Sequence, residues 1–262
     1  MAQLFVVATP IGNLDDASVR VRDVLGSVGL ILAEDTRRTR ALLTALKIPA
    51  PSIHSCHAHN EESRIDMVVD HLGRGVDVAV VSDAGTPAVS DPGSVVVKAV
   101  HASGYPVISV AGPSSVVSAV AAAGFAATPF HFLGFPPKKA GALTRWIKES
   151  SRLPGVLVVL ERGARCGKLI AALAQALPDR EAVICRELSK KHEESIRGPL
   201  TELSVEPQRG EVVVVIGPGA AIVDESAQPS GPDLKAISAA LAERWGCTRR
   251  EAYQRLLAIE ND

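Results

Sequence analysis

Short apolar runs alternate with amphipathic stretches along the first half of the chain. Residues 4–8, 30–33, 76–81 and 107–110 consist almost entirely of apolar side chains, many of them β-branched. Such runs are too apolar for a sheet with one face in water, so they predict strands that are buried on both faces. The segments between them carry apolar residues at helical spacing. Strands that alternate with helices in this order predict a parallel sheet covered by helices on both faces.

Cap residues predict where these helices begin. Thr36 is predicted to be the N-cap of one helix and Asn60 that of another, because both side chains can accept a hydrogen bond from a free backbone N–H of the first turn. Two further helices are predicted to start where a cap residue precedes a proline: Asp91-Pro92 and Gly112-Pro113.

The chain changes character at residues 124–137, where Phe, Gly and Pro cluster. This cluster indicates a domain boundary. The segments after it predict a second α/β unit, with one helix near 169–177 and strands over 156–160, 182–187, 192–197 and 211–216. Because a short turn at 189–191 joins two of these strands as a hairpin, the second sheet is predicted to be mixed.

The end of the chain is predicted to be a linker followed by two helices. Residues 222–232 are rich in polar residues, Pro and Ser, as linkers are. Apolar residues at helical spacing predict a first helix that ends at Gly246, and Thr248-x-x-Glu251 is a capping box that opens a second one. The predicted organisation is an N-terminal α/β domain, a C-terminal α/β domain, and a linker with a helical tail, over 1–124, 125–221 and 222–262.

The composition excludes several classes of protein. The 262 residues are 47% hydrophobic and 22% charged, which is typical of a globular protein with a core. The net charge of -1 argues against a protein that coats nucleic acid or anionic membrane by bulk charge, and 3% aromatic residues are too few for a base-stacking surface. Four scattered cysteines without a C-x-x-C pair indicate a reducing compartment. No apolar run approaches the ~20 residues that span a bilayer, so we expect a cytoplasmic protein.

Ligands of open parallel sheets bind beyond the carboxyl ends of the strands. In this chain those ends are followed by loops of small and polar residues, over 9–14, 34–38, 57–61, 82–87 and 111–115. The chain has neither a G-x-G-x-x-G motif after the first strand nor a P-loop motif, which disfavours a dinucleotide-binding or nucleotide-hydrolysing protein. The loop over 82–93 combines glycines, prolines and two acids. It would suit a bulky ligand that bears a sulfonium, such as S-adenosylmethionine.

Six motifs follow one another along the chain. They are T-P-I-G-N-L (9–14), A-E-D-T-R (33–37), H-x-H-N-E (57–61), V-S-D-A-G-T-P-x-x-S-D-P-G (81–93), G-P-S (112–114) and R-E-L-S-K-x-H-E-E (186–194). Together they closely resemble the ribosomal RNA small subunit methyltransferase I family of the tetrapyrrole-methylase-like superfamily. The resemblance covers residues 1 to about 216, and the helical tail is similar to the C-terminal extension of that family.

The resemblance implies a two-domain class III methyltransferase fold that holds S-adenosylmethionine in the cleft between the domains. It also implies 2′-O-methylation of a cytidine ribose in the decoding region of small-subunit (16S-type) ribosomal RNA, free or in the assembled subunit, by a homodimer. The positions that match the cofactor-contacting loops of the superfamily are Pro10, Asp83, Ala84, Gly85, Ser114 and Ser115. The chain departs from the family at residues 161–165, which read E-R-G-A-R where the family usually has an element like E-S-P-H-R.

Methyl transfer to a ribose hydroxyl requires that oxygen, methyl carbon and sulfur are aligned and that the hydroxyl loses its proton. We expect Asp35 or His59 to take or orient this proton, and Arg37 to contact a backbone phosphate. The alternative for Asp35 is an acid that stabilises a helix N-terminus. The alternative for His59 is a loop residue that positions RNA without proton transfer.

A metal site is not expected, although the segment 54–59 holds three histidines and a cysteine. In an extended chain His57 and Cys56 point to opposite sides, so four ligands do not converge easily. No partner ligands stand at zinc spacing elsewhere. Displacement at a sulfonium needs no metal.

Basic residues recur near the predicted ligand-binding edge and in the second domain. The candidates for RNA binding are Arg38, Arg40, Lys138, Lys139, Lys190 and Lys191. Each cluster alone would be ordinary solvated surface, but clusters that converge on one cleft would form a track for phosphates.

Two other functions stay open at this point. A tetrapyrrole C-methyltransferase, of the uroporphyrinogen or precorrin type, would share the superfamily fold. Those enzymes typically have a G-P-G-D-like loop where this chain has P-I-G-N (10–13), and they lack the helical tail. A ribosome-assembly factor without catalytic activity would bind RNA through the same surfaces.

Overall fold

The computed structural model of the protein describes residues 1–207, 210–219, 238, 241–242 and 244–259. The chain divides into two compact units, Met1–Ala220 and Ala221–Asp262. Within the described residues, none of the helices has the length and apolar character that crossing a bilayer requires.

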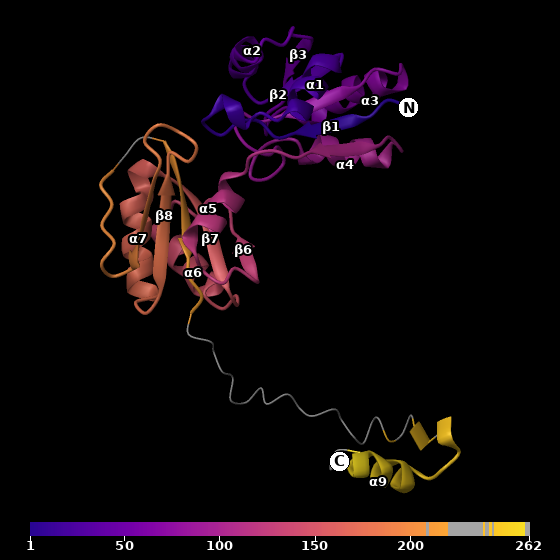
Figure 1. The fold of residues 1–262 in the computed structure, drawn as a ribbon, viewed down its shortest axis with the longest axis vertical. Coiled ribbons are helices and arrows are strands. Elements are labelled where there is room, and N and C mark those ends of the chain that lie inside the picture. The colour runs from indigo at the N-terminus through magenta and orange to yellow at the C-terminus, as the bar shows by residue number, and fades with distance from the viewer. Residues whose placement is uncertain (208–209, 220–237, 239–240, 243, 260–262) are drawn as a thin grey trace. The chain divides into compact units, whose positions relative to one another are not determined.

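The first sheet has five parallel strands in the order β3-β2-β4-β1-β5. Strands β1, β2 and β3 are labelled in the indigo to purple part of the ribbon in Figure 1. The strands are β1 (Leu4–Val7), β2 (Leu30–Ala33), β3 (Ser52–Ser55), β4 (Val78–Val81) and β5 (Val107–Val110). The helices are α1 (Val19–Ser27), α2 (Thr36–Ala45), α3 (Ile65–Gly73), α4 (Ser94–Ala102) and α5 (Ser115–Ala123), with 3-10 turns η1 (Leu14–Asp16) and η2 (Glu62–Arg64). The predicted parallel sheet is therefore confirmed. Only β3, an edge strand with partly exposed residues, lacks the apolar run that marks the other four.

The first sheet has a hydrophobic core on each face, because successive residues of a strand point to opposite sides. On one face Phe5 and Ile31 pack in a cluster with residues of α1 and α2. On the other face Leu4 and Leu30 pack in a cluster with residues of α3 and α4. Burial on both faces explains why these strands have no polar alternation.

The second sheet has the order β6-β7-β10-β8-β9. Its elements are β6 (Phe130–Phe132), α6 (Ala140–Ser150), β7 (Val156–Arg162), α7 (Gly163–Ala176), β8 (Glu181–Arg186), β9 (Glu194–Pro199) and β10 (Glu211–Ile216). Strand β6 pairs with β7 in parallel and the other pairs are antiparallel, so the predicted mixed sheet and the β8–β9 hairpin are confirmed.

Helix α5 follows the first sheet in the chain but packs against the second. Val116 and Ala119 of α5 belong to the same buried cluster as Val158 and Val213, whereas α6 and α7 pack on the opposite face of that sheet. Strand β6 lies inside the Phe- and Pro-rich cluster where the sequence indicated only a domain boundary. The boundaries of the two α/β domains, 1–124 and 125–221, stay a prediction.

The predicted starts of the first two helices are wrong by one residue and by one turn or more. The side chain of Asp35, not Thr36, accepts the N–H of Arg37 and caps α2. Helix α3 begins only after η2, and Asn60 accepts the N–H of His57 at 2.7 Å instead of capping a helix. Asp35 takes the capping role at α2, whereas no side chain caps α3, and spacing along the chain reveals neither outcome.

The two proline-based helix starts are also wrong. Helix α4 is preceded by Gly93, whose φ is 129°, so Asp91 stands outside it. Helix α5 is capped by Ser114, which accepts the N–H of Val117, so Gly112 lies two residues before the cap. The prolines end the preceding loops and do not occupy a first helical position.

The second unit contains helix α9 (Arg249–Ile259). Its predicted capping box is confirmed, since Glu251 N–H donates to Thr248 Oγ1 at 3.4 Å and Thr248 N–H donates to Glu251 Oε2 at 2.8 Å. The linker predicted over 222–232 and most of the first tail helix lie outside the described residues.

A buried glutamate joins the loop after β3 to the start of α4. Glu61 is 8% exposed, and its Oε2 accepts the N–H of Gly93 at 2.9 Å and that of Val95 at 3.2 Å. A carboxylate at this position satisfies two free N–H groups of the helix N-terminus and interacts favourably with its positive end. Glu61 therefore holds the end of the β4–α4 loop in place.

Replacing this glutamate should destabilise the first sheet and its helices. In Glu61→Ala, two N–H groups lose their acceptor, and we expect the free energy of unfolding to fall by about 1–3 kcal/mol. Urea unfolding followed by circular dichroism measures the loss. The control is Glu62→Ala, which removes an exposed neighbour and should stay within about 0.5 kcal/mol of the wild type. Equal unfolding midpoints for Glu61→Ala and Glu62→Ala would contradict the assignment.

Candidate functional site

A pocket of about 450 Å³ lies between the carboxyl edge of the first sheet and one side of the second. This volume is within the range of small-molecule sites. The first-sheet side supplies loop residues after β1, β2, β4 and β5, and the second-sheet side supplies strand and turn residues. The lining residues that bear on its chemistry are Ile11, Glu34, Arg38, Asp83, Gly85, Asp91, Ser114, Phe135, Leu160, Glu187, Lys190, Glu211 and Val213.

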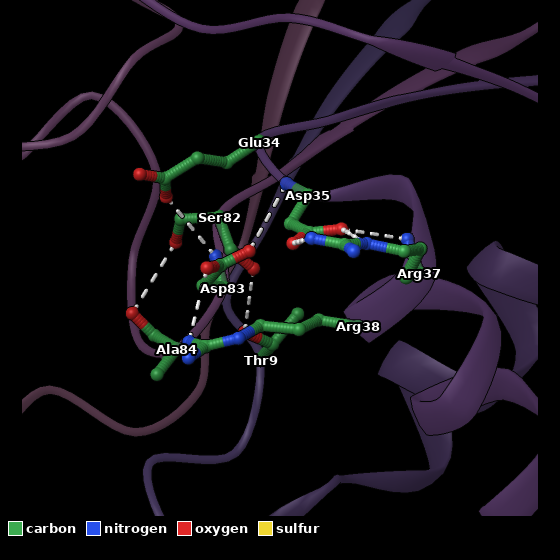
Figure 2. Close-up of polar contacts among 8 residues, drawn as sticks. All are labelled: Thr9, Glu34, Asp35, Arg37, Arg38, Ser82, Asp83 and Ala84. Atoms are coloured by element: carbon green, nitrogen blue, oxygen red, sulfur yellow. Dashed lines mark hydrogen bonds and ion pairs between the residues drawn. The ribbon is translucent and has the colours of Figure 1, made fainter.

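The carboxylate of Asp83 connects the ends of two neighbouring strands (Figure 2). Its Oδ1 accepts the N–H of Asp35 at 3.1 Å, and its Oδ2 pairs with Nη1 of Arg38 at 3.0 Å. In return, the N–H of Asp83 donates to Oε2 of Glu34 at 3.3 Å. These contacts fix the position of the β4–α4 loop against the end of β2 and the start of α2.

A second set of contacts fixes the same loop to β1. The backbones of Thr9 and Gly85 exchange two hydrogen bonds, at 2.9 and 3.0 Å, and the fully buried Thr9 hydroxyl donates to the Ser82 carbonyl at 3.3 Å. Gly85 has φ 81°, a conformation in which a side chain would be strained. At Gly85 the loop therefore presents its backbone, and no side chain, to the pocket.

The loop after β1 approaches the β8–β9 turn closely. A side chain at Gly12 would place its Cβ 2.9 Å from the carbonyl oxygen of Leu188, which is closer than real Cβ contacts. Glycine at position 12 therefore allows the first-sheet loop to meet the turn that carries Lys190. This contact closes one side of the pocket.

Carboxylates outnumber cations in the pocket. Five acids line it, and they are Glu34, Asp83, Asp91, Glu187 and Glu211, against Arg38 and Lys190. Both cations are already paired, Arg38 with Asp83 and Lys190 with Glu187, each at 3.0 Å. The remaining negative charge favours a ligand that carries positive charge.

One of these acids has a strongly altered pKa. Burial raises the pKa of Asp91 to about 6, and the neighbouring Glu34 acts in the same direction. A hydrogen bond from Ser82 opposes this effect, while Glu211 and Asp83 add to it. Perturbed carboxylates in pockets are often functional.

The pocket brings together most of the cofactor-contacting positions proposed from the resemblance. Asp83, Ala84, Gly85, Ser114 and Ser115 all line it. Pro10 is not among the lining residues, although its neighbour Ile11 is. These assignments to a cofactor stay predictions.

The basic candidates divide into two groups. Arg38 and Lys190 line the pocket, and Lys190 also lines, together with Lys191, an adjoining open hollow formed with residues 12–15. Arg40, Lys138 and Lys139 are exposed and line neither.

The predicted catalytic residues lie outside the pocket lining. Asp35 accepts hydrogen bonds from both the backbone and the side chain of Arg37, with a 3.0 Å ion pair (Figure 2). The side-chain hydrogen bond from Arg37 is the main reason that the pKa of Asp35 falls to about 2. His59 is exposed, and its N–H donates to Nδ1 of His57. Among the described residues, no group of three or more His, Cys, Asp or Glu could hold a metal ion.

Four acids of the pocket are not among the site residues that the sequence predicts, and they are Glu34, Asp91, Glu187 and Glu211. Glu34 lies in one of the loops that the sequence places at the ligand-binding edge. Asp91 precedes a proline, which favours a helix cap, and the D-P-G end of its motif is the signal that could have found it. Glu187 and Glu211 stand at the ends of second-sheet strands, and nothing in their local sequence shows that these ends face the first sheet.

Residues 161–165, which depart from the family pattern, contain an ion pair and contact the segment before α6. Glu161 is 2% exposed and lies 3.4 Å from Nη2 of Arg165, which also donates to the carbonyl of Pro137 at 3.5 Å. This pair connects the start of α7 to the segment that carries Phe135, a pocket residue.

Comparison with protein families places most of the chain in one group. Residues 3–204 match the tetrapyrrole (corrin/porphyrin) methylases. A ribosomal RNA small subunit methyltransferase I from Neisseria meningitidis serogroup A is 39% identical over 221 residues, which are 82% of this chain and 76% of the relative. The protein of that name from Thermotoga maritima is 39% identical over 82% of this chain and 98% of its own.

Solved structures show the same fold at low identity. The methyltransferase CobJ has a TM-score of 0.63 at 18% identity, over 84% of this chain and 95% of its own. A uroporphyrin-III C-methyltransferase from Thermus thermophilus, in complex with S-adenosyl homocysteine, has a TM-score of 0.55 at 19% identity, over 83% of this chain and 97% of its own. The predicted α/β class III methyltransferase fold is confirmed.

The Asp35–Arg37 pair should resist acid. The pKa of Asp35 is lowered from 3.8 to about 2, so its carboxylate stabilises the folded state at pH values above 3.8. This contribution is lost as the pH falls from 3.8 towards 2. A carbon-detected NMR titration of the Asp35 carboxyl should have its midpoint near 2 in the wild type. In Arg37→Ala the midpoint should return towards 3.8, whereas Arg40→Ala, one turn further along α2, should leave it unchanged. A wild-type midpoint close to 3.8 would contradict the pairing.

Proposed function

Because the chain belongs to the ribosomal RNA small subunit methyltransferase I family of the tetrapyrrole methylases, we propose that it uses S-adenosylmethionine to methylate small-subunit ribosomal RNA. The methyl group goes to the 2′-hydroxyl of a cytidine ribose in the decoding region. The observation that carries the proposal is the acidic pocket at the carboxyl edge of the first sheet, built from the motif loops.

The residues of the pocket fit this methyl donor. S-adenosylmethionine supplies a methyl group bonded to a positively charged sulfur. The surplus of carboxylates suits that charge and the amino group, and the backbone at Gly85 leaves space for close approach. Apolar side chains of Ile11, Leu160 and Val213 offer contacts for an adenine ring.

The motif loops hold the donor, and each has a definite contribution. Asp83 orders the loop that contains Ala84 and Gly85, and Ser114 and Ser115 present hydroxyl and N–H groups at the start of α5. Pro10 precedes Ile11, which lines the pocket, and it restricts the backbone of the loop after β1. The second-sheet wall excludes water from the reacting atoms, because its lining includes Leu160 and Val213.

The rRNA enters along basic residues outside the acidic interior. Arg38 and Lys190 stand at the pocket, Lys191 next to it, and Arg40, Lys138 and Lys139 extend the basic surface. Arg37 contacts a backbone phosphate, and Asp35 and His59 position the substrate near the pocket. The substrate is free rRNA or the assembled subunit, the protein acts as a homodimer, and it works in the cytoplasm, where ribosomes are assembled.

Two other functions compete with this one. The solved structures of tetrapyrrole methylases share the fold, but at 18–19% identity they support the architecture alone. The relatives at 39% identity cover four fifths of the chain and carry the rRNA methyltransferase name, which favours RNA over a tetrapyrrole. A binding factor without catalysis would not need an acidic pocket that fits a sulfonium.

Labelled donor separates the three functions. The protein is incubated with tritiated S-adenosylmethionine and, in parallel, with methylation-deficient small subunits, naked rRNA and uroporphyrinogen III. We expect label in rRNA, in a nucleoside whose base is unmodified and whose ribose is methylated. Gly85→Val, which would strain the loop at φ 81°, should abolish labelling. Label in the tetrapyrrole, in a base, or in none of the substrates would contradict the proposal.

The salt dependence of RNA binding tests the basic surface. The double variant Lys190→Ala/Lys191→Ala should bind rRNA more weakly, and the slope of log affinity against log salt should fall by about 0.7 for each phosphate that the variant no longer neutralises. Filter binding at several salt concentrations measures both quantities. Lys168→Ala is the matched control, because Lys168 is exposed on α7, which packs on the other face of the second sheet. An unchanged slope in the double variant would remove these lysines from the RNA-binding surface.

A further inference from the structure

Asp91 is a pocket carboxylate that belongs to the S-D-P-G end of the motif over 81–93. It lies on the loop between β4 and α4 and is half-buried. Glu34 and Ser114, which follow β2 and β5, line the same pocket. The side chain therefore lines the pocket that is proposed to hold the methyl donor.

The loop around Asp91 is held from both sides. Ala88 and Ser90 have φ of 64° and 66°, a region that L residues rarely occupy, and the N–H of Ala88 donates to the carbonyl of Pro92 at 3.1 Å. On the other side, buried Glu61 accepts the N–H of Gly93. Such conformations persist only where the surrounding structure determines them, so the loop presents Asp91 at a fixed position.

The groups around Asp91 make it a base suited to neutral pH. The charged side chains that line the pocket with it are Glu34, Arg38, Asp83, Glu187, Lys190 and Glu211. Arg38 and Lys190 are paired with other acids, and among the described residues no Lys, Arg or His forms an ion pair with Asp91. Burial and the nearby acids bring its pKa to about 6. A general base is most effective when its pKa lies close to the working pH.

We propose that Asp91 is the catalytic base that accepts the proton of the ribose hydroxyl during methyl transfer, an inference that rests on the proposed function. The hydroxyl oxygen forms a bond to the methyl carbon as the bond between that carbon and sulfur breaks, and the electron pair of the broken bond goes to sulfur. The hydroxyl proton passes to an Oδ of Asp91 and then to solvent. Charge balances, since a cationic donor and a carboxylate become a neutral thioether and a carboxylic acid.

This assignment differs from the expectation for Asp35 and His59. Both residues lie outside the pocket lining, and Arg37 holds the carboxylate of Asp35 in an ion pair. A carboxylate with a pKa of about 2 accepts a proton far less readily at neutral pH than one with a pKa of about 6. Asp35 and His59 then act on the substrate by position alone.

Single-turnover rates and equilibrium binding test the role of Asp91. Rates of methyl transfer to small subunits are measured between pH 5 and 8.5 for the wild type, Asp91→Asn, Asp35→Asn and Asp70→Asn. Calorimetry gives the affinity of each protein for S-adenosylmethionine and for S-adenosyl homocysteine. Asp70→Asn is the matched control, because Asp70 is a carboxylate on α3 that pairs with Arg74 at the surface.

We expect the wild-type rate to fall tenfold per pH unit below about 6. Asp91→Asn should lose about 10²–10⁴-fold of the rate and the fall below pH 6. Because four other carboxylates remain in the pocket, its affinity for both ligands should stay close to that of the wild type. Asp35→Asn and Asp70→Asn should keep the fall below pH 6.

Three outcomes would overturn the inference. The first is an Asp91→Asn rate and pH profile like those of the wild type. The second is a loss of affinity for S-adenosylmethionine but not for S-adenosyl homocysteine, which would make Asp91 a partner of the sulfonium charge. The third is a wild-type protein that labels no rRNA, which would overturn the proposed function as well. Labelling by the wild type therefore separates a failure of this inference from a failure of the function.

Discussion

The carboxylate of Asp83 joins the ends of two neighbouring strands, and the shape of the pocket depends on this connection. Loops at the carboxyl edge of a parallel sheet receive no hydrogen bonds from the sheet itself, so their backbone groups need other partners. Asp83 accepts the N–H of Asp35 and pairs with Arg38, and the backbone bridge between Thr9 and Gly85 acts from the other side. Because the same loop is held at both points, Gly85 and the residues after it can face the pocket without support from a ligand.

The net charge of -1 conceals a separation of charge within the molecule. Carboxylates gather inside the pocket, whereas Lys191, Arg40, Lys138 and Lys139 lie outside its lining. An acidic interior attracts a cationic methyl donor, and it repels a polyanionic RNA unless basic residues nearby compensate. On the proposed function, this arrangement allows a near-neutral protein to bind both partners, each at its own place, without binding RNA indiscriminately.

The second sheet contributes to the site in a way that its own core does not reveal. One face of this sheet packs on α6 and α7, and the other receives α5, which has crossed over from the first sheet. Residues at strand ends, among them Glu187 and Glu211, then face the loops of the first sheet. Arg165 pairs with Glu161 and donates to the carbonyl of Pro137. The segment that departs from the family pattern therefore holds residues close to Phe135, which lines the pocket.

The sequence by itself determined four of the five strands of the first sheet, the hairpin of the second sheet and the first-sheet loops that line the pocket. A parallel strand that is buried on both faces has a continuous apolar run, which makes it recognisable in the sequence. Parallel strands have their carboxyl ends at one edge of the sheet. Asp83, Gly85 and Ser114 could therefore be placed at the same edge from their positions in the chain. Only the tertiary structure decided which acids share the pocket, where α2, α3, α4 and α5 begin, and that Asp91 is half-buried among carboxylates. Those properties depend on contacts between side chains that are far apart in the chain. The local sequence around each residue does not predict such contacts.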